Sequence, residues 1–179
     1  MERVTKAVVL AAGFGKRLRP FTDHLPKPLL PVAGEPILSR VLDALADWGV
    51  TDVRVNAHWF AGKVAKFADA WNAVEPEMKV AVAEERDILG TGGVLKPLAA
   101  WLGDEPFYLV NGDVVFSGFD PAPLADAFER SGRFAACWMS ETDGPRTIEA
   151  DPDGRVCCWK SPDPGVSGTY TYCGGALLS

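Results

Sequence analysis

The sequence has no excess of positive charge: its 179 residues include 18 Lys and Arg against 24 Asp and Glu, a formal net charge of −6. Broad binding of nucleic acid needs a surplus of positive side chains. We therefore expect no nucleic-acid partner, although a few basic residues in one loop can still bind a single nucleotide. No apolar run approaches the ~20 residues of a membrane-spanning helix. The apolar stretch within Met1–Leu10 is also too short for a signal peptide, so we expect no membrane partner.

Histidine and cysteine are scarce, which leaves few candidates for metal or redox chemistry. The two histidines, His24 and His58, have no evident catalytic partner. The cysteines include an adjacent pair that does not match a zinc-binding spacing, and no histidine lies near them. We interpret them as small core or strand residues of a protein in the reducing cytoplasm: Cys137, Cys157, Cys158 and Cys173. The six tryptophans show no common spacing, and we assign most of them to core packing.

Apolar residues make up 47% of the chain, which suits one domain over residues 1–179 with a sizeable core. Up to residue 133, short apolar or alternating runs typical of strands alternate with segments of helical spacing. The predicted strands are 7–12, 52–57, 78–83 and 106–111, and the predicted helices run from Pro36 to Gly49, over 60–72, over 94–102, and from Asp120–Pro121 to Gly132. This alternation predicts a mostly parallel central sheet flanked by helices, an α/β fold whose ligands bind at the carboxyl ends of the strands.

The pattern changes at Phe134. Strand-like segments follow one another, separated by turns: 134–140, 146–150, 155–160 and 169–178. We therefore expect a β-rich C-terminal part.

The first motif follows the strand at 7–12 and combines Gly13 and Gly15 with three basic residues, Lys16, Arg17 and Arg19. Glycines after a buried strand let the backbone approach a phosphate group and offer N–H donors to it. Leu18 occupies the third glycine position of a dinucleotide-binding fingerprint, and the Gly-Lys-Ser/Thr of a P-loop is absent. The basic residues favour a ligand with concentrated negative charge, such as a triphosphate.

The second motif is Pro26-Lys27-Pro28, in which two prolines fix the backbone around one lysine. An ammonium group held beside a phosphate can neutralise charge during phosphoryl transfer. A plain surface loop is the alternative for this tripeptide taken alone.

The third motif is Glu85, followed five residues later by the predicted turn Gly90–Gly93. A glycine-rich turn lets a flat base lie against the backbone, and a carboxylate can accept hydrogen bonds from the edge of that base. Guanine, which has adjacent N–H donors, suits Glu85 better than uracil. A solvated acid at a strand-to-helix turn is the alternative.

The fourth motif is Asn111-Gly112-Asp113, at the carboxyl end of the strand at 106–111. Magnesium in phosphate-binding sites takes one or two carboxylates, with phosphate oxygens and water as its other ligands. Asp113 is therefore a candidate Mg²⁺ ligand, and an Asx turn or helix cap is the alternative.

Taken in order, the four motifs resemble the sugar-1-phosphate nucleotidyltransferase family, most closely its bacterial N-acetylmuramate-1-phosphate uridylyltransferases and its mannose- or heptose-1-phosphate guanylyltransferases. The resemblance implies a GT-A-like, Rossmann-related fold. It also implies Mg²⁺-dependent, in-line attack of a sugar-1-phosphate on the α-phosphorus of a nucleoside triphosphate. Residues 1–133 would form the nucleotide-binding part, and 134–179 the start of the sugar-binding part.

The resemblance also implies roles for individual residues. Arg17 would hold the β- and γ-phosphates, and Lys27 would bind the α-phosphate or the sugar phosphate. Asp113 would bind Mg²⁺, and Asn111 would lie near the ribose or the sugar. The nucleotide would further contact Ala11, Ala12, Gly13, Gly15, Glu85 and Gly90, and weaker candidates for the sugar phosphate are Lys160 and Gly174.

Two departures from the family pattern leave other functions open. Family members usually exceed 200 residues and carry a second magnesium-binding Asp late in the chain, so we interpret this sequence as a fragment. Many relatives also have a Glu-Lys-Pro where Trp159-Lys160-Ser161 stands here. A non-catalytic nucleotide-binding module is one alternative. A cytidylyltransferase acting on phosphocholine is another, and it would need clustered aromatic side chains around the quaternary ammonium.

Overall fold

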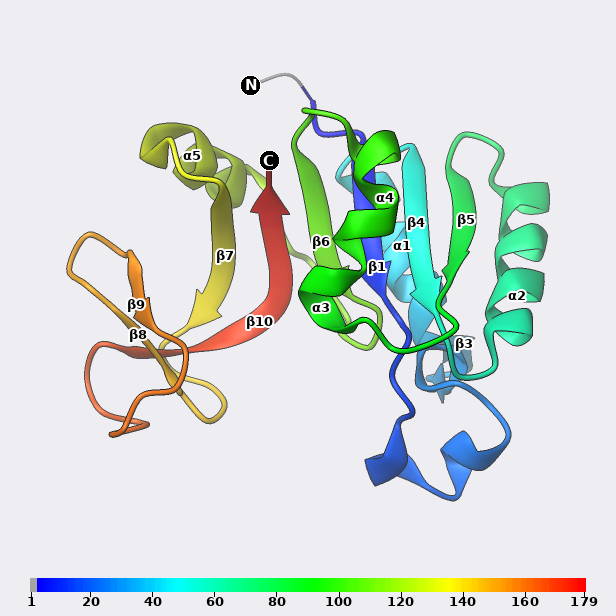
Figure 1. Ribbon diagram of the computed structural model, residues 1–179, viewed down its shortest axis with the longest axis horizontal. Coiled ribbons are helices and arrows are strands. Elements are labelled where there is room, and N and C mark those ends of the chain that lie inside the picture. Colours follow the sequence, from blue (N-terminus) through cyan, green and yellow to red (C-terminus); the bar gives the residue numbers. More distant parts are fainter. Residues whose placement is uncertain (1–2) are drawn as a thin grey trace.

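Four parallel strands form the centre of the protein in the computed structural model, which describes residues 3–179 (Figure 1). Side by side they are β5 (Lys79–Glu84), β4 (Asp52–Ala57), β1 (Lys6–Leu10) and β6 (Phe107–Asn111). Each was predicted as a strand within two residues of these bounds. The middle residues of β1 and β6 are buried, as expected for strands covered on both faces.

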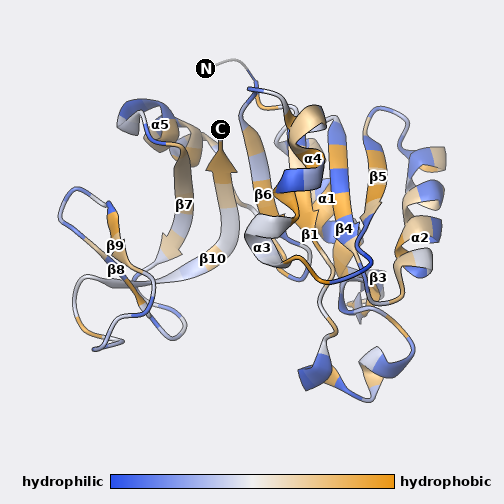
Figure 2. Ribbon diagram, in the orientation of Figure 1, coloured by the Kyte–Doolittle hydropathy of each residue, from blue (hydrophilic) through white to orange (hydrophobic). Residues whose placement is uncertain are grey.

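Helices cover both faces of this sheet (Figures 1 and 2). One face packs against α1 (Ile37–Asp47) and α2 (Ala61–Val74), and the other against α4 (Leu95–Leu102), which continues a single turn, α3 (Gly90–Gly93). Over the described residues, no helix has the length and apolar character needed to cross a membrane. Fully buried side chains of the first face include Leu38, Leu42, Leu45, Val53 and Val64, and the second face buries Val8, Val94, Leu98 and Leu109.

The C-terminal part extends the sheet with antiparallel strands, which confirms its predicted β-rich character. The long strand β10 (Thr169–Leu178) pairs with β6 on one side and with β7 (Ala135–Ser140) on the other. Its first residues also pair with β8 (Ile148–Ala150), which continues to β9 (Val156–Cys158). The remaining helix, α5 (Ala122–Ser131), packs beside β7 and β10 (Figure 1).

An aromatic cluster joins the two parts of the chain. The Trp48 ring lies 5.3 Å from that of Tyr108 and 5.2 Å from that of Trp138, and its Nε1 donates to the Phe119 carbonyl at 3.1 Å. The assignment of most tryptophans to core packing is confirmed by Trp48 and by the partly buried Trp71, Trp101 and Trp138 that pack against core residues, whereas Trp159 is 57% exposed.

The four cysteines lie in strands and are free. Burial raises the pKa of the Cys137 thiol, and burial together with the Asp143 carboxylate raises the pKa of the Cys173 thiol. Both thiols therefore stay protonated at neutral pH and react slowly. The prediction of strand residues is confirmed, although Cys157 is exposed and so is no core residue.

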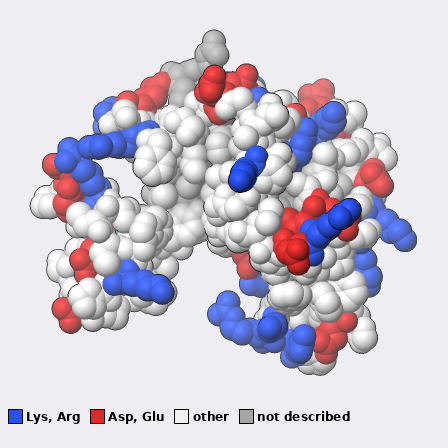
Figure 3. Space-filling model, viewed as in Figure 1, with Lys and Arg blue, Asp and Glu red and all other residues white. Residues whose placement is uncertain are grey.

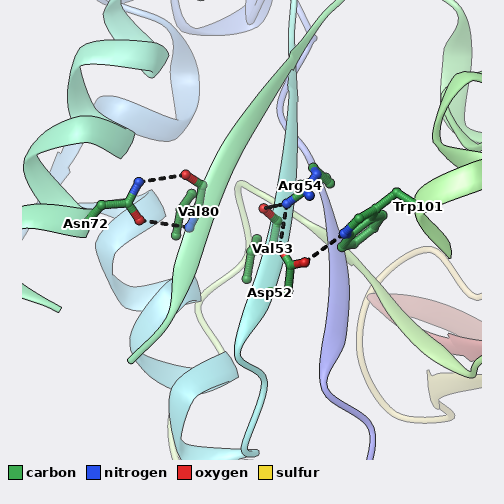
Figure 4. A network of polar contacts seen from close by, with 6 residues as sticks. All are labelled: Asp52, Val53, Arg54, Asn72, Val80 and Trp101. Carbon is green, nitrogen blue, oxygen red and sulfur yellow. Dashed lines mark hydrogen bonds and ion pairs between the residues drawn. The ribbon is translucent and has the colours of Figure 1, made fainter. Parts of the chain in front are cut away.

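Polar contacts fasten helices to the neighbouring strands β4 and β5 (Figure 4). The Trp101 Nε1 of α4 donates to Asp52 Oδ2 at 2.8 Å, and Arg54 lies 4.3 Å above the Trp101 ring while pairing with Asp52. On the opposite face, the Asn72 amide bonds both the N–H and the C=O of Val80 at 2.8 Å. These two hydrogen bonds satisfy backbone groups of the edge strand β5 that have no strand partner.

Two sequence predictions were wrong in detail. Gly90–Gly93 forms a helical turn that runs into α4, with the Val94 N–H donating to the Gly90 carbonyl at 3.3 Å, although glycine is a poor helix former. Pro36 lies one residue before α1 and pairs with Pro31 in a small hairpin, β2 (Pro31–Val32) and β3 (Glu35–Pro36). Periodicity does not reveal such two-residue strands.

Candidate active site

The carboxyl ends of β1, β4 and β6 meet at one edge of the sheet. Leu10, the last residue of β1, lies in register with Asn56 of β4 and with Asn111 of β6. A cavity of about 600 Å³ opens there, and a second of about 160 Å³ lies beside it. Both are lined by Leu10, Gly13 and Thr91, so they form one continuous candidate site.

Nearly all the predicted site residues lie at these two cavities. The larger cavity is lined by Ala11, Gly13, Gly15, Arg17, Lys27, Asn111 and Asp113. The smaller cavity is lined by Ala12, Gly13, Glu85 and Gly90. Gly174 lines neither cavity but lies against Asn111. Glu85 thus lines the smaller of the two adjoining cavities, and the basic residues line the larger one.

The loop after β1 is folded back by Thr22, a residue that the sequence did not single out. Gly15 has φ +63°, and a Cβ there would lie 2.8 Å from the Thr22 methyl group. The Thr22 side chain is 1% exposed, and its hydroxyl donates to the Gly15 carbonyl at 3.0 Å. Trp59 Nε1 in turn donates to the Thr22 carbonyl at 2.9 Å. These contacts fix the loop while leaving its basic side chains exposed.

The basic residues of this loop differ in their partners. Arg19 pairs with Asp23 at 3.2 Å, and the Lys16 ammonium lies 5.3 Å from the centre of the Phe14 ring. Arg17 lines the larger cavity and has no hydrogen bond or ion pair with any described residue. Figure 3 shows a concentration of positive side chains over this loop, at the lower edge of the molecule. Arg17 is thus the guanidinium best placed to bind an anion in the cavity.

Lys27 and Asp113 form a hydrogen-bonded ion pair at the larger cavity. Lys27, which is flanked by two prolines, is the first residue of a short 3₁₀ turn, Lys27–Leu29. Gly112 brings Asp113 close, because a Cβ at Gly112 would lie only 3.0 Å from the Leu10 carbonyl oxygen. The side chains of Lys27 and Asp113 are 28% and 33% exposed, so both charges remain accessible to a ligand.

Glu85 is buried, and the alternative of a solvated acid is therefore wrong. Its side chain is 6% exposed, its Oε1 accepts a hydrogen bond from Asn56 Nδ2 at 2.7 Å, and its Oε2 accepts one from the Leu89 N–H at 2.9 Å. His58 Nδ1 lies 2.9 Å from the Glu85 carbonyl oxygen. The carboxylate therefore has a fixed orientation at the wall of the smaller cavity.

Gly174 lies where β10 departs from regular pairing. The register between β10 and β7 shifts between Tyr172 and Ala176, and Gly174 has φ +85°. A Cβ there would lie 2.8 Å from a Val114 methyl group and 3.2 Å from Asn111 Nδ2. The side chain of Asn111 is thereby supported from the β-rich part of the chain.

The sequence profile of the family described as "Nucleotidyl transferase" matches residues 6–156. The chain belongs to this family.

Curated members of the nucleotidyl transferase family are similar to the chain over different lengths. An N-acetylmuramate alpha-1-phosphate uridylyltransferase from Caulobacter vibrioides is 38% identical over 111 residues, 62% of this chain and 46% of the relative. A mannose-1-phosphate guanylyltransferase from Mycobacterium tuberculosis is 35% identical over 177 residues, 93% of this chain and 48% of the relative. The chain thus spans about half the length of these curated relatives.

Solved structures show the same fold. The inositol-1-phosphate CTP transferase from T. maritima has a TM-score of 0.79 at 21% identity, covering 99% of this chain and 71% of that chain. A UDP-glucose pyrophosphorylase complexed with UDP-glucose has a TM-score of 0.77 at 16% identity, covering 98% of this chain and 76% of that chain. The predicted Rossmann-related, GT-A-like fold is confirmed for this chain.

Two residues of the candidate site, Thr22 and Asn56, were not predicted from the sequence. Thr22 stands in a proline-rich stretch without periodicity, and Asn56 is a polar residue near the end of a strand, where such residues are common. One feature of the sequence could have indicated Asn56, because an Asn within an apolar strand needs a hydrogen-bonding partner. Its partners, Ala11 and Glu85, however, directly follow the two neighbouring strands β1 and β5, so only the register of the sheet reveals them.

Proposed function

We propose that the protein transfers a nucleoside monophosphate from a nucleoside triphosphate to a sugar-1-phosphate, giving a nucleoside diphosphate sugar and pyrophosphate. The observation that carries this proposal is the pair of adjoining cavities. One holds Arg17, Lys27 and Asp113, and the other holds Glu85 at its wall. Their combined shape and charge suit a polyphosphate joined to a flat polar base. The names of the curated relatives support the same reaction.

The reaction needs little proton transfer. An oxygen of the sugar phosphate attacks the α-phosphorus and forms the new P–O bond. The bond from that phosphorus to the bridging oxygen of the β-phosphate breaks, and pyrophosphate leaves with the electron pair. Because a phosphate monoester has a second pKa of about 6, the attacking oxygen is already largely ionised at neutral pH. This agrees with a larger cavity that has no histidine among its lining residues in the described chain.

The side chains therefore have two tasks, to position the substrates and to neutralise the charge of their phosphates. Arg17, which lines the cavity and has no partner among residues 3–179, would bind the β- and γ-phosphates and stabilise departing pyrophosphate. Lys27 would hold the α-phosphate or the incoming sugar phosphate. Its pairing with Asp113 keeps the ammonium directed at the cavity.

We also propose that magnesium is required. The described residues contain no group of three or more side chains that could enclose a metal ion. The Asp113 carboxylate nevertheless fits Mg²⁺, which takes one or two carboxylates and completes its coordination with phosphate oxygens and water. Bound there, the ion would supply positive charge against the phosphates of the nucleotide.

The base would occupy the smaller cavity beside Glu85 and Gly90. A carboxylate that accepts hydrogen bonds matches the N1–H and N2–H donors of guanine. Uracil offers one such donor, flanked by two carbonyl oxygens that a carboxylate repels. Guanosine triphosphate is therefore the preferred donor by chemistry, whereas the uridylyltransferase relative points to uridine triphosphate.

The phosphocholine alternative gains no support from the site. No aromatic side chain lines either cavity in the described part of the chain, whereas a quaternary ammonium group is recognised by aromatic faces. The tightest aromatic group, around Trp48 and Trp138, packs inside the protein. A sugar phosphate remains the better acceptor.

Pyrophosphate release tests the proposal. UTP, GTP, CTP and dTTP would each be combined with N-acetylmuramate-, mannose-, glucose- or heptose-1-phosphate and Mg²⁺. A reducing buffer is appropriate, since the four cysteines are free and we propose a cytoplasmic setting. One productive pair would establish reaction, base and sugar together. Nucleotide binding without turnover across the whole grid would instead favour the binding-module alternative.

A further inference from the structure

Asn56 lies between the two parts of the candidate site. As the penultimate residue of β4, it is in register with Leu10 of β1 on one side and Ala83 of β5 on the other. The chain continues from Leu10 into the glycine-rich, basic loop that follows β1, and from Ala83 to Glu85. A side chain at position 56 can therefore reach both, and that of Asn56 is 3% exposed.

The hydrogen bonds of Asn56 fix its orientation. The Ala11 N–H donates to Asn56 Oδ1, so the amide nitrogen must point the other way, where Nδ2 donates to Glu85 Oε1 at 2.7 Å. The Ala11 N–H is thereby engaged within the protein, which leaves its carbonyl oxygen for the nucleotide contact implied for Ala11. One amide links the backbone after β1 to the carboxylate after β5.

The same contacts define the state of Glu85. Asn56 Nδ2 donates to one carboxylate oxygen and the Leu89 N–H donates to the other, so both oxygens act as acceptors. No ion pair joins Glu85 to a Lys or Arg among the described residues. Glu85 is thus a buried acceptor at the wall of an open cavity, with lone pairs left for a ligand.

We infer that Asn56 is the positioning residue for base selection, an inference that rests on the proposed function. It orients the Glu85 carboxylate as an acceptor toward the base and ties that carboxylate to the backbone that precedes the phosphate loop. The base contact and the phosphate contacts are then held at a fixed spacing by one side chain. The ligand that this arrangement selects is a purine nucleotide with adjacent N1–H and N2–H donors, namely a guanine nucleotide.

Inosine triphosphate is a suitable probe, because its base lacks only the N2 amino group of guanine. A hydrogen bond to a charged group contributes about 1.5–3 kcal/mol. We therefore expect the unmodified chain to bind GTP about 10- to 100-fold more tightly than ITP.

The variant Asn56→Asp keeps the size of the side chain and the acceptor for Ala11 N–H, but it replaces the amide donor with a second carboxylate. Two neighbouring carboxylates raise the pKa of one of them. At low pH a proton shared by the pair would replace the lost N–H donor, and at high pH the repulsion between the two charges would push Glu85 away. The preference for GTP over ITP should therefore survive at pH 5.5 and fall below about threefold at pH 8.5.

The measurement is calorimetric titration of the 179-residue chain with GTP, ITP and UTP in Mg²⁺ at both pH values. Asn72→Asp is the matched control, because it removes the same kind of amide donor from a contact with Val80 on β5, away from both cavities. Its GTP preference should equal that of the unmodified chain. His58 is the other titratable group in contact with residue 85, and its effect on affinity will be present in all variants.

The possible outcomes separate the two proposals. If the unmodified chain binds no nucleotide, the proposed function itself fails. If it binds nucleotides but does not distinguish GTP from ITP, or if Asn56→Asp keeps the preference at pH 8.5, the inference fails while the function stands. Should Asn56→Asp not fold, as judged by circular dichroism, Asn56→Ser replaces it. Serine is too short to bridge Ala11 and Glu85 and should lose the preference at both pH values.

Discussion

The parts of the chain before and after residue 133 differ in how their strands are buried. In the α/β part, every interior residue of β1 is buried, and so are the first four residues of β6. In the β-rich part, each residue of β7 is only half-buried, and β9 has two exposed residues. Burial on both faces fixes the register of a strand. The α/β part can therefore hold polar groups at defined positions along its carboxyl edge.

One strand, β10, shares the properties of both parts. Its residues Gly174–Leu177 are buried beside β6, whereas Tyr170–Cys173 are half-buried among the antiparallel strands. The register shift lies where these stretches meet, next to Asn111. The groups suited to binding phosphate and base thus lie at the edge of the well-packed α/β part. The side toward the proposed sugar depends on a segment with fewer buried contacts, which lowers local stability.

The largest expected effect comes from the carboxyl edge of the α/β part. Asp113→Asn removes the proposed magnesium-binding charge and the ionic partner of Lys27. We expect turnover, measured as pyrophosphate release, to fall at least ~100-fold, which is typical for loss of a group that stabilises charge in the transition state. The fold should persist, since the side chain is 33% exposed.

Asp153→Asn in the β-rich part is the control for this variant. Its carboxylate is 75% exposed in the turn between β8 and β9, and pyrophosphate release should remain unchanged. Near-normal turnover of Asp113→Asn would place the metal site elsewhere. A large loss in Asp153→Asn would show that the two parts do not differ in function as we propose.

The difference in packing predicts a smaller, purely structural contrast for one substitution made in each part. Val64 in α2 is fully buried, and Val156 in β9 is 40% exposed. Val64→Ala should lower the free energy of unfolding by about 1.5–3 kcal/mol, because transfer and cavity terms add. Val156→Ala should change it by about 0.5 kcal/mol or less. Urea unfolding followed by circular dichroism measures both, and equal losses would contradict the contrast.

The same contrast explains how much the sequence could predict. Strands such as 106–111 are readable because burial on both faces requires continuous apolar runs, and Gly13, Lys27 and Asp113 stand out because their residue types suit phosphate and magnesium. Contacts that join different strands are not readable in this way. The buried Glu85 carboxylate accepts a hydrogen bond from Asn56, 29 positions earlier in the chain, and only the register of β4 and β5 brings the two together.

The smallest expected effect lies at the join between the two parts. Gly174 and Gly154 have similar backbone conformations, with φ +85° and +78°, so replacing either with alanine incurs a similar backbone cost of about 1–2 kcal/mol. Their surroundings differ: a Cβ at Gly154 meets nothing within 4 Å, whereas one at Gly174 meets Val114 and Asn111. Gly174→Ala should therefore displace Asn111 and raise the KM for the sugar phosphate several-fold more than Gly154→Ala, with little change in nucleotide affinity. Initial rates at varied sugar phosphate, with nucleotide titrations alongside, test this. Equal KM values for the two variants would show that β10 does not contribute to binding the sugar phosphate. A parallel loss of nucleotide affinity in Gly174→Ala would mean that Gly174 supports the whole edge of the sheet.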